Sequence, residues 1–156
     1  YPGPACYGFG GPLCLTDINL ILGRLDRNLF STPVSMEGAR QKLMQCAELS
    51  GYSEGELMTG FIAIADETMA RAIRKISVKQ GYDPAKHDLV SFGGAGGQHI
   101  CGVAQRLGVQ RILSPGDSGL LSAYGLSMSR IERVVEQPIY QALSRAEFVK
   151  FENELI

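Results

Sequence analysis

The feature that most constrains the fold of this chain is a glycine-rich segment between an apolar run and a helical pattern. Residues 89–92 are mostly apolar, and four of the five residues at positions 93–97 are glycine. Glycine has no Cβ atom, so this segment can turn tightly and let a ligand approach the backbone. A helix predicted over residues 98–107 would offer unpaired N–H groups and partial positive charge at its start. These features favour a site for a phosphate or for the ribose-phosphate region of a nucleotide.

The motif differs from two common phosphate-binding loops. No Lys followed by Ser or Thr comes after the glycines, which excludes a P-loop. The register that ends at His99 reads G-x-G-x-x-H and lacks the third glycine of the dinucleotide fingerprint. A purely structural role for the glycines, as a tight link between strand and helix, stays open. The candidate ligand-binding residues are those of the turn: Gly93, Gly94, Ala95, Gly96, Gly97 and Gln98.

The elements around the turn predict an α/β (α+β) fold class. The helix over residues 98–107 ends at Gly108, and residues 109–113 form a second apolar run. A strand–helix–strand order of this kind predicts a short β-α-β unit with two parallel strands.

Three further elements are predicted in the C-terminal part. An apolar helix runs through Leu120 and Met128, and a possible strand follows over residues 134–140. Ser144 and Glu147 have the spacing of a capping box, which predicts a terminal helix.

The N-terminal half is predicted to be helical after a loop-rich start. Residues 1–12 are rich in glycine and proline, and a short helix follows from about Thr16. Ser35 is a plausible N-cap for a second helix that stops at Gly51. The apolar face of the short helix consists of Ile18, Ile21, Leu22 and Leu25.

The third predicted helix has the strongest local signals. Ser53 and Glu56 form an S-x-x-E capping box at its start. Gly81 fits the left-handed position at its end, and Pro84 prevents continuation. The face expected to be buried consists of Leu57, Phe61, Ile64, Thr68, Ala72 and Ile76.

These elements predict one domain of 156 residues, of which 45% are hydrophobic, enough for a sizeable core. Within it we expect a loop-rich segment (1–34), a helical subdomain (35–84), an α/β nucleotide-binding unit (88–142) and a terminal helix (143–156). Fifteen basic and sixteen acidic residues give a net charge of −1, so nothing favours nucleic acid or an anionic membrane as partner. No signal peptide or membrane-spanning run is found, so the expected location is cytoplasmic.

The cysteines and the candidate catalytic residues give weaker signals. The four cysteines form no C-x-x-C pair, so no metal site is predicted, and free buried thiols are expected. His99 is a catalytic candidate by its proton chemistry, although packing or hydrogen bonding is the favoured role. Asp17 and Asn19 could face one ligand or, as we favour, cap the helix that begins there. Arg24 could pair with a substrate carboxylate or with Asp26.

Several longer motifs occur in an order that resembles the hydantoinase A/5-oxoprolinase family. Residues 3–8 read G-P-A-C-Y-G, and residues 16–25 read T-D-I-N-L-I-L-G-R-L. The middle helix and the G-Y-D-P at residues 81–84 are similar to the same family. F-G-G-A-G-G-Q-H at residues 92–99 and S-G-L-L-S-A-Y-G-L at residues 118–126 resemble the 5-oxoprolinase branch in particular. The resemblance covers essentially the whole chain.

The resemblance implies a helix-rich fragment of the actin/Hsp70/sugar-kinase type of ATPase fold, in which two RNase H-like halves close over ATP. Residues 93–97 match the adenosine motif of that fold, and the helix at 122–128 looks like its hinge helix. The D-x-G-G-T-like phosphate segments do not occur here. The resemblance therefore implies ATP as cofactor, with the Mg²⁺ ligands outside this fragment, and a chain that is inactive alone.

For the parent protein the resemblance implies ATP-dependent opening of a cyclic amide, by phosphorylation of the lactam oxygen. The substrate would be 5-oxoproline, which yields glutamate, or a hydantoin. The alternatives are a subunit of an ATP-dependent carboxylase of the same family and a non-catalytic interaction module. Expected partners are the rest of the parent chain, a hydantoinase B-like subunit or domain and a small cyclic amide; a homo-oligomer is also possible.

Overall fold

The computed structural model describes residues 3–134, 136, 138 and 140. The backbone forms two units, residues 1–122 and 123–156, and each is considered by itself. The single-domain plan and its internal boundaries stay predictions. The elements in chain order are α1 (Leu15–Ile21), α2 (Met36–Ser50), α3 (Glu54–Lys79), β1 (Leu89–Val90), α4 (Ile100–Leu107), β2 (Ile112–Leu113) and α5 (Leu121–Met128).

Helix α1 begins one residue before the position predicted from sequence. Its N-cap is Cys14, whose backbone N–H donates to the Asp17 carboxylate at 2.7 Å. The same carboxylate accepts hydrogen bonds from the backbone amides of Ala5 and Cys6, in the 3-10 helix η1 (Ala5–Tyr7). One buried side chain therefore caps α1 and fixes the glycine- and proline-rich segment before it.

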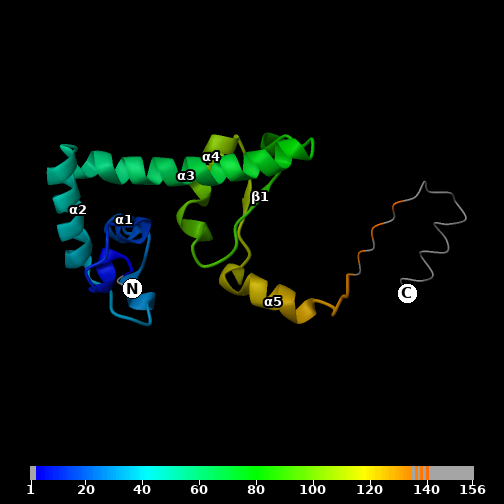
Figure 1. Ribbon diagram of the computed structural model, residues 1–156, viewed down its shortest axis with the longest axis horizontal. Coiled ribbons are helices and arrows are strands. Elements are labelled where there is room, and N and C mark those ends of the chain that lie inside the picture. Colours follow the sequence, from blue (N-terminus) through cyan, green and yellow to red (C-terminus); the bar gives the residue numbers. More distant parts are fainter. Residues whose placement is uncertain (1–2, 135, 137, 139, 141–156) are drawn as a thin grey trace, which may run out of the picture. The chain divides into compact units, whose positions relative to one another are not determined.

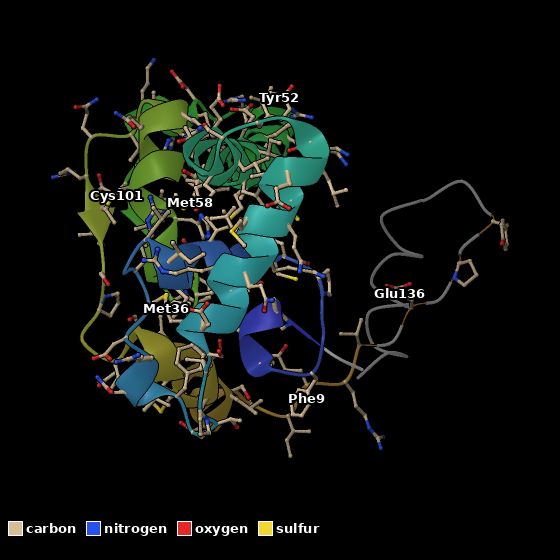
Figure 2. All side chains as sticks on the ribbon, turned by 90° about the vertical axis from the view of Figure 1, so that its left-hand side faces the viewer. Phe9, Met36, Tyr52, Met58, Cys101 and Glu136 are labelled. Carbon is tan, nitrogen blue, oxygen red and sulfur yellow. The ribbon has the colours of Figure 1, made fainter. Side chains whose placement is uncertain are left out.

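Helices α2 and α3 form as their end signals predict. The Ser35 hydroxyl accepts from the Gly38 amide, and Gly51 ends α2 in the left-handed conformation. Ser53 and Glu56 complete the capping box of α3, and Gly81 follows that helix with φ +81°. Figure 1 shows α2 at one end of the long helix α3, and Tyr52 lies at the corner between them (Figure 2).

The buried face of α3 differs from the predicted one. Ile64 and Ile76, which were expected in the core, are 70% and 62% exposed. The buried residues are Ala65, Asp66 and Ala70. The partners decide this choice: small residues and a hydrogen-bonded Asp allow α3 and α4 to pack closely, while the larger residues stay outside. Hydrophobic periodicity marks an apolar face, but it does not say which of two neighbouring faces meets the next helix.

The predicted β-α-β unit is confirmed, with shorter strands and a later helix start. β1 and β2 pair in parallel, with Leu89 opposite Ile112 and Val90 opposite Leu113. The predicted helix over residues 98–107 divides into the 3-10 helix η4 (Gly96–Gln98) and α4, which starts at Ile100. Glycine at two of the three η4 positions disfavours regular α-helix, which explains the delayed start.

Two small clusters of packed side chains form part of the apolar core among the described residues. The first packs Cys6, Leu20 and Ala39 from η1, α1 and α2. The second packs Ala70 of α3 against Val103 and Leu107 of α4. Helix α3 contacts both α1 and α4, so it holds the N-terminal helices and the β-α-β unit in one arrangement.

Helix α5 confirms the apolar helix predicted near residues 120–128, preceded by the 3-10 helix η5 (Ser118–Leu120). The possible strand at residues 134–140 falls partly outside the described residues, and the terminal helix at 144–155 lies wholly outside them. Among the residues that the structure describes, no helix is both long enough and apolar enough to cross a membrane.

Candidate functional site

The glycine turn links β1 to α4, and its two ends are held by backbone hydrogen bonds. Gly93 adopts φ +83°, a conformation that favours glycine, and its amide donates to the Ser118 carbonyl at 2.8 Å. The Gly96 amide donates back to the Gly93 carbonyl at 3.4 Å. Ser91, 4% exposed, lies just before the turn, and its hydroxyl packs close to Gly96. These contacts within the protein hold both ends of the turn, so its backbone has a defined conformation.

Three backbone amides of the turn are left over for a ligand. Within the described part of the chain, the N–H groups of Gly94, Ala95 and Gly97 donate to no protein acceptor. All three residues are exposed, and a Cβ at Gly94 or Gly97 would meet no atom within 4 Å. Successive free N–H groups beside open space suit an anionic or hydrogen-bond-accepting ligand. These residues are compatible with a nucleotide, and its binding at the turn stays a prediction.

A hollow of about 360 Å³ borders the turn. The segment after α1 lines it with Arg24, Leu25, Asp26, Leu29 and Phe30, and the turn lines it with Gly94, Gly97 and Gln98. The apolar side chains of Leu25 and Phe30 are half-buried, and with the bare glycine backbone they line a surface that an apolar or aromatic group can contact. A cation and a carboxylate at the same hollow supply polar contacts of both signs.

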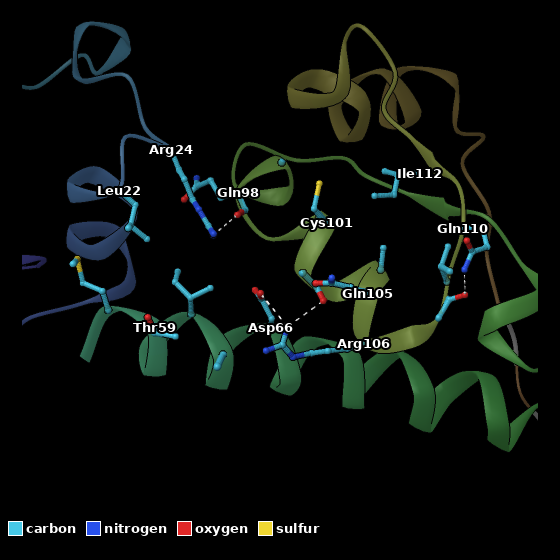
Figure 3. Close-up of a pocket in the computed structure, with 18 of the residues that line it drawn as sticks. Leu22, Arg24, Thr59, Asp66, Gln98, Cys101, Gln105, Arg106, Gln110 and Ile112 are labelled. Atoms are coloured by element: carbon cyan, nitrogen blue, oxygen red, sulfur yellow. Dashed lines mark hydrogen bonds and ion pairs between the residues drawn. The ribbon is translucent and has the colours of Figure 1, made fainter. Parts of the chain in front are cut away.

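Gln98 is held from two directions at the end of the turn. Its side-chain Oε1 accepts from Nδ2 of Asn19 at 2.9 Å, and its carbonyl accepts from Arg24 at 2.9 Å. Figure 3 shows Arg24 reaching from the α1 side to the Gln98 carbonyl. Arg24 is therefore not paired with Asp26, one of the two roles considered for it. Both contacts connect the turn to α1 and the residues just after it.

His99 lies at the N-cap position of α4 and is 9% exposed. Its Nδ1 lies 2.7 Å from Oδ1 of Asp66, and its Nε2 lies 3.0 Å from Nδ2 of Asn19. Both ring nitrogens thus have partners inside the protein. This agrees with the hydrogen-bonding role favoured for His99, while its catalytic role stays a prediction.

Asp66 joins α3 to α4 at their closest approach. Besides His99, its carboxylate contacts Arg106 Nη1 at 3.4 Å, and Arg106 also reaches the Gly102 carbonyl at 3.2 Å (Figure 3). A Cβ at Gly102 would collide with the Asp66 carboxylate, so only glycine fits there without a shift. The buried carboxylate has two hydrogen-bond partners, His99 and the Arg106 cation, as buried charge requires.

Asp17, the other catalytic candidate, is 0% exposed. Its two oxygens accept from the amides of Ala5, Cys6 and Cys14 at 2.7–3.2 Å. The capping role favoured for Asp17 is therefore what its contacts support. Asn19 does not cap α1; its side chain instead reaches the glycine turn from within that helix.

A larger groove of about 1190 Å³ runs between α3 and α4 and also reaches the turn. Its lining includes Arg24, Thr59, Gln98, Cys101, Gln105 and Arg106, shown in Figure 3. Arg24 and Gln98 line both this groove and the smaller hollow. Arg24 and Gln98 therefore lie between the larger groove and the smaller hollow.

The four cysteines are free thiols, but only one matches the expected burial fully. Cys6 is buried, Cys14 and Cys46 are half-buried, and Cys101 is exposed. Burial, with the nearby Asp17 carboxylate, raises the pKa of the Cys6 thiol to about 12. Burial and Asp17 also raise the pKa of Cys14. The Cys6 thiol is thus protonated at neutral pH and a poor nucleophile.

Within residues 3–134, 136, 138 and 140, no group of three or more His, Cys, Asp or Glu side chains could hold a metal ion.

Sequence reasoning found the turn and named Asn19, Arg24 and His99, but it did not predict the contacts through which they support the turn. Asp66 was not singled out, because an Asp within a helical pattern is usually exposed to solvent and no local signal marks this one as buried. The contact between Asn19 and Gln98 spans 79 residues, and no local pattern reports it. Phe30 lies in a predicted loop and carried no signal for a binding surface.

Two solved enzyme structures share the fold of this chain. An ATP-dependent caprolactamase from Pseudomonas jessenii matches with a TM-score of 0.72 and 34% identity, over 80% of this chain and 19% of that one. A nucleotide-free acetone carboxylase matches with a TM-score of 0.71 and 24% identity, over 80% of this chain and 18% of that one. The second likeness is evidence for the fold alone. The chain is an α/β segment of the kind found in these larger enzymes.

A family model described as Hydantoinase/oxoprolinase matches residues 1–135. A 5-oxoprolinase PfmaA from Pestalotiopsis fici is 41% identical over 89% of this chain, and the Saccharomyces cerevisiae 5-oxoprolinase is 36% identical over 95%. The chain belongs to the hydantoinase/oxoprolinase family, as its motifs indicated. It spans 12% and 13% of the length of these two relatives.

Proposed function

We propose that this chain supplies the adenosine side of the ATP site in a larger ATP-dependent cyclic-amide hydrolase. The observation that carries the proposal is the glycine turn, whose free amides at Gly94, Ala95 and Gly97 border the 360 Å³ hollow. The fold in which this turn acts would be the actin-like ATPase fold. A nucleotide placed there would be contacted by backbone on one side and by Phe30 and Leu25 on the other.

Each part of the hollow has a distinct role in this proposal. The free amides donate to acceptor atoms of the nucleotide, and the absence of Cβ atoms at Gly94 and Gly97 allows the close approach. The apolar side chains give the base a surface that excludes water. Arg24 adds positive charge for the ribose-phosphate region, although one of its N–H groups is already used by the Gln98 carbonyl.

The preferred substrate of the parent protein is 5-oxoproline, with glutamate as product. Relatives that carry the name 5-oxoprolinase, at 35–41% identity in three organisms, support this choice. ATP supplies the phosphoryl group that activates the cyclic amide. Phosphate-binding segments and Mg²⁺ ligands would come from other parts of the parent chain, so this segment alone would be inactive.

The remaining expectations for the parent protein are part of the same proposal. They are a cytoplasmic location, contact with the rest of the parent chain, and a hydantoinase B-like subunit or domain as partner. Hydantoin opening is the second hydrolase candidate. A caprolactamase subunit alpha from Pseudomonas jessenii, 35% identical over 83% of this chain, supports the view that the substrate could be a cyclic amide other than 5-oxoproline.

The test is ATP hydrolysis by the full-length protein, with its partner subunit if it has one. ADP and glutamate should form together, in equal amounts, when 5-oxoproline is added. ADP release that depends on hydantoins would move the substrate to the hydantoinase branch. Release that depends on bicarbonate would instead make the protein a carboxylase. No ADP release with any of these compounds would contradict the proposed activity.

A further inference from the structure

A chain of buried hydrogen bonds runs from α3 to the glycine turn. Asp66 contacts His99, His99 contacts Asn19, and Asn19 contacts the side chain of Gln98, at 2.7, 3.0 and 2.9 Å. Asp66, His99 and Asn19 are 3%, 9% and 1% exposed, so water does not compete for the two bonds of His99, while the bond to Gln98 is part-buried. This chain therefore links α3, the start of α4 and α1 to one residue of the turn, Gln98.

The donors and acceptors of this chain have one consistent arrangement. Nδ1 of His99 faces the Asp66 carboxylate, which only accepts, so this nitrogen carries the proton. Nδ2 of Asn19 can only donate, so Nε2 of His99 is the acceptor of this bond. The second hydrogen of the same Nδ2 points to Oε1 of Gln98. Both amide hydrogens of Asn19 are thus used to hold the end of the turn.

This arrangement leaves the side-chain oxygen of Asn19, Oδ1, buried without a hydrogen bond from the described residues, which costs stability. Among the described residues it is the one buried side-chain nitrogen or oxygen without a hydrogen-bond partner. An unpaired buried acceptor is destabilising, and a leucine of similar size would avoid it. The two donors of Asn19 therefore do something that a packing residue could not do.

We infer that Asn19 and His99 are positioning residues, which fix Gln98 and through it the conformation of the turn that receives the nucleotide. Arg24 holds the Gln98 carbonyl from the exposed side and completes the support. The inference rests on the proposed function for the identity of the ligand. Its core, that Asn19 acts on the turn through the Gln98 side chain, concerns the protein alone.

A double-mutant cycle in the full-length protein tests this path. Asn19→Leu removes both donors at similar volume, and Gln98→Met removes the Oε1 acceptor. The ATP dissociation constant, measured by calorimetry, should rise about tenfold in Asn19→Leu. In the Gln98→Met background, the same change should raise it less than twofold, because the path is already broken. At saturating ATP the turnover number of Asn19→Leu should stay within threefold of wild type.

Equal effects of Asn19→Leu in the two backgrounds would overturn the inference, because a residue that only supports the fold weakens binding additively. An unchanged dissociation constant in a folded Asn19→Leu protein would overturn it too. If Asn19→Leu does not fold, Gln98→Met alone decides. Without nucleotide, its amides at residues 94–99 should exchange hydrogen at least fivefold faster than wild type, and unchanged rates refute the path.

Failure of the proposed function gives a different result. A wild-type protein that binds no ATP contradicts the nucleotide site but leaves the positioning path testable. The same four proteins are then compared by hydrogen exchange at residues 94–99. The path is supported without any ligand if Asn19→Leu speeds exchange in the wild-type background but adds nothing in the Gln98→Met background. It is refuted if the effects of the two substitutions on exchange are additive.

Discussion

The carboxylate of Asp66 on α3 occupies the space that a side chain at position 102 of α4 would need. Gly102 therefore sets how closely the two helices approach, and this approach brings the carboxylate within 2.7 Å of His99. The glycine turn that precedes α4 depends on the same contact, because His99 directly follows it. The packing of α3 against α4 therefore also determines where the candidate site lies.

Gly102→Ala should loosen the contact between α3 and α4. The added Cβ collides with the Asp66 carboxylate, and overpacking of this kind typically costs about 1–3 kcal/mol. Hydrogen exchange of the α4 amides in the full-length protein should become faster by the corresponding factor. Gly60→Ala on α3 is the matched control, since its Cβ meets open space and alanine favours the helix by roughly 0.5–1 kcal/mol. Slower exchange of the α4 amides in Gly102→Ala would contradict this prediction, because it would mean that the two helices accommodate the added Cβ without strain.

Asp17→Asn should release the N-terminal segment without stopping turnover. The amide places an N–H group where a carboxylate oxygen now accepts from Ala5, Cys6 or Cys14. Loss of a charge-assisted bond costs about 1.5–3 kcal/mol, so the amides of Cys6 and Cys14 should exchange much faster. Thr16→Ala, next to Asp17, serves as control. A variant with unchanged exchange and abolished turnover would instead favour the catalytic role considered for Asp17.

The cysteines should react in an order set by burial. At pH 8 iodoacetamide should label exposed Cys101 first, while Cys6, whose pKa is raised to about 12, should stay unlabelled until the protein unfolds. Mass spectrometry of peptides reads both sites in one sample. Labelling of Cys6 at the same rate as Cys101 in folded protein would contradict its burial.

The raised pKa of Cys6 also predicts how stability depends on pH. The unfolded thiol loses its proton near pH 9.0, whereas the folded thiol keeps it to about pH 12. Above pH 9 the folded state therefore binds more protons, so this group makes the free energy of unfolding fall as pH rises from 9 toward 12. Below pH 9 it has no effect. Denaturant unfolding at pH 8, 9 and 10, with Cys6→Ala as comparison, measures the slope; an equal slope in both proteins would exclude Cys6 as its source.

Local signals in the sequence predicted the helix ends and the turn well. These signals act within a few residues, so their effect can be predicted without knowledge of the tertiary structure. They are the capping box at Ser53 and Glu56, the left-handed Gly51 and the glycines at 93–97. The parallel strand pair was predictable for a similar reason, because β1, α4 and β2 follow one another directly.

The contacts that complete the site could not be predicted in this way. Asn19 meets His99 across 80 residues, and Asp66 meets it across 33, because α3 brings α1 and α4 together. The predicted face of α3 was wrong for the same reason: Ile64 carries the stronger hydrophobic signal, but Asp66 has the partners. The choice of a buried face depends on the neighbouring element, which periodicity does not contain.

The most direct test of the central claim is ATP binding by the full-length protein and its Gly94→Val variant. A side chain at Gly94 points into open space and its backbone needs no left-handed conformation, so valine should leave the fold intact while it blocks the turn. Gly116→Val, outside the hollow and equally free of neighbours, is the control. The account predicts at least tenfold weaker ATP binding in Gly94→Val alone, with unchanged hydrogen exchange in α3 and α4. Equal ATP affinity in all three proteins would contradict it.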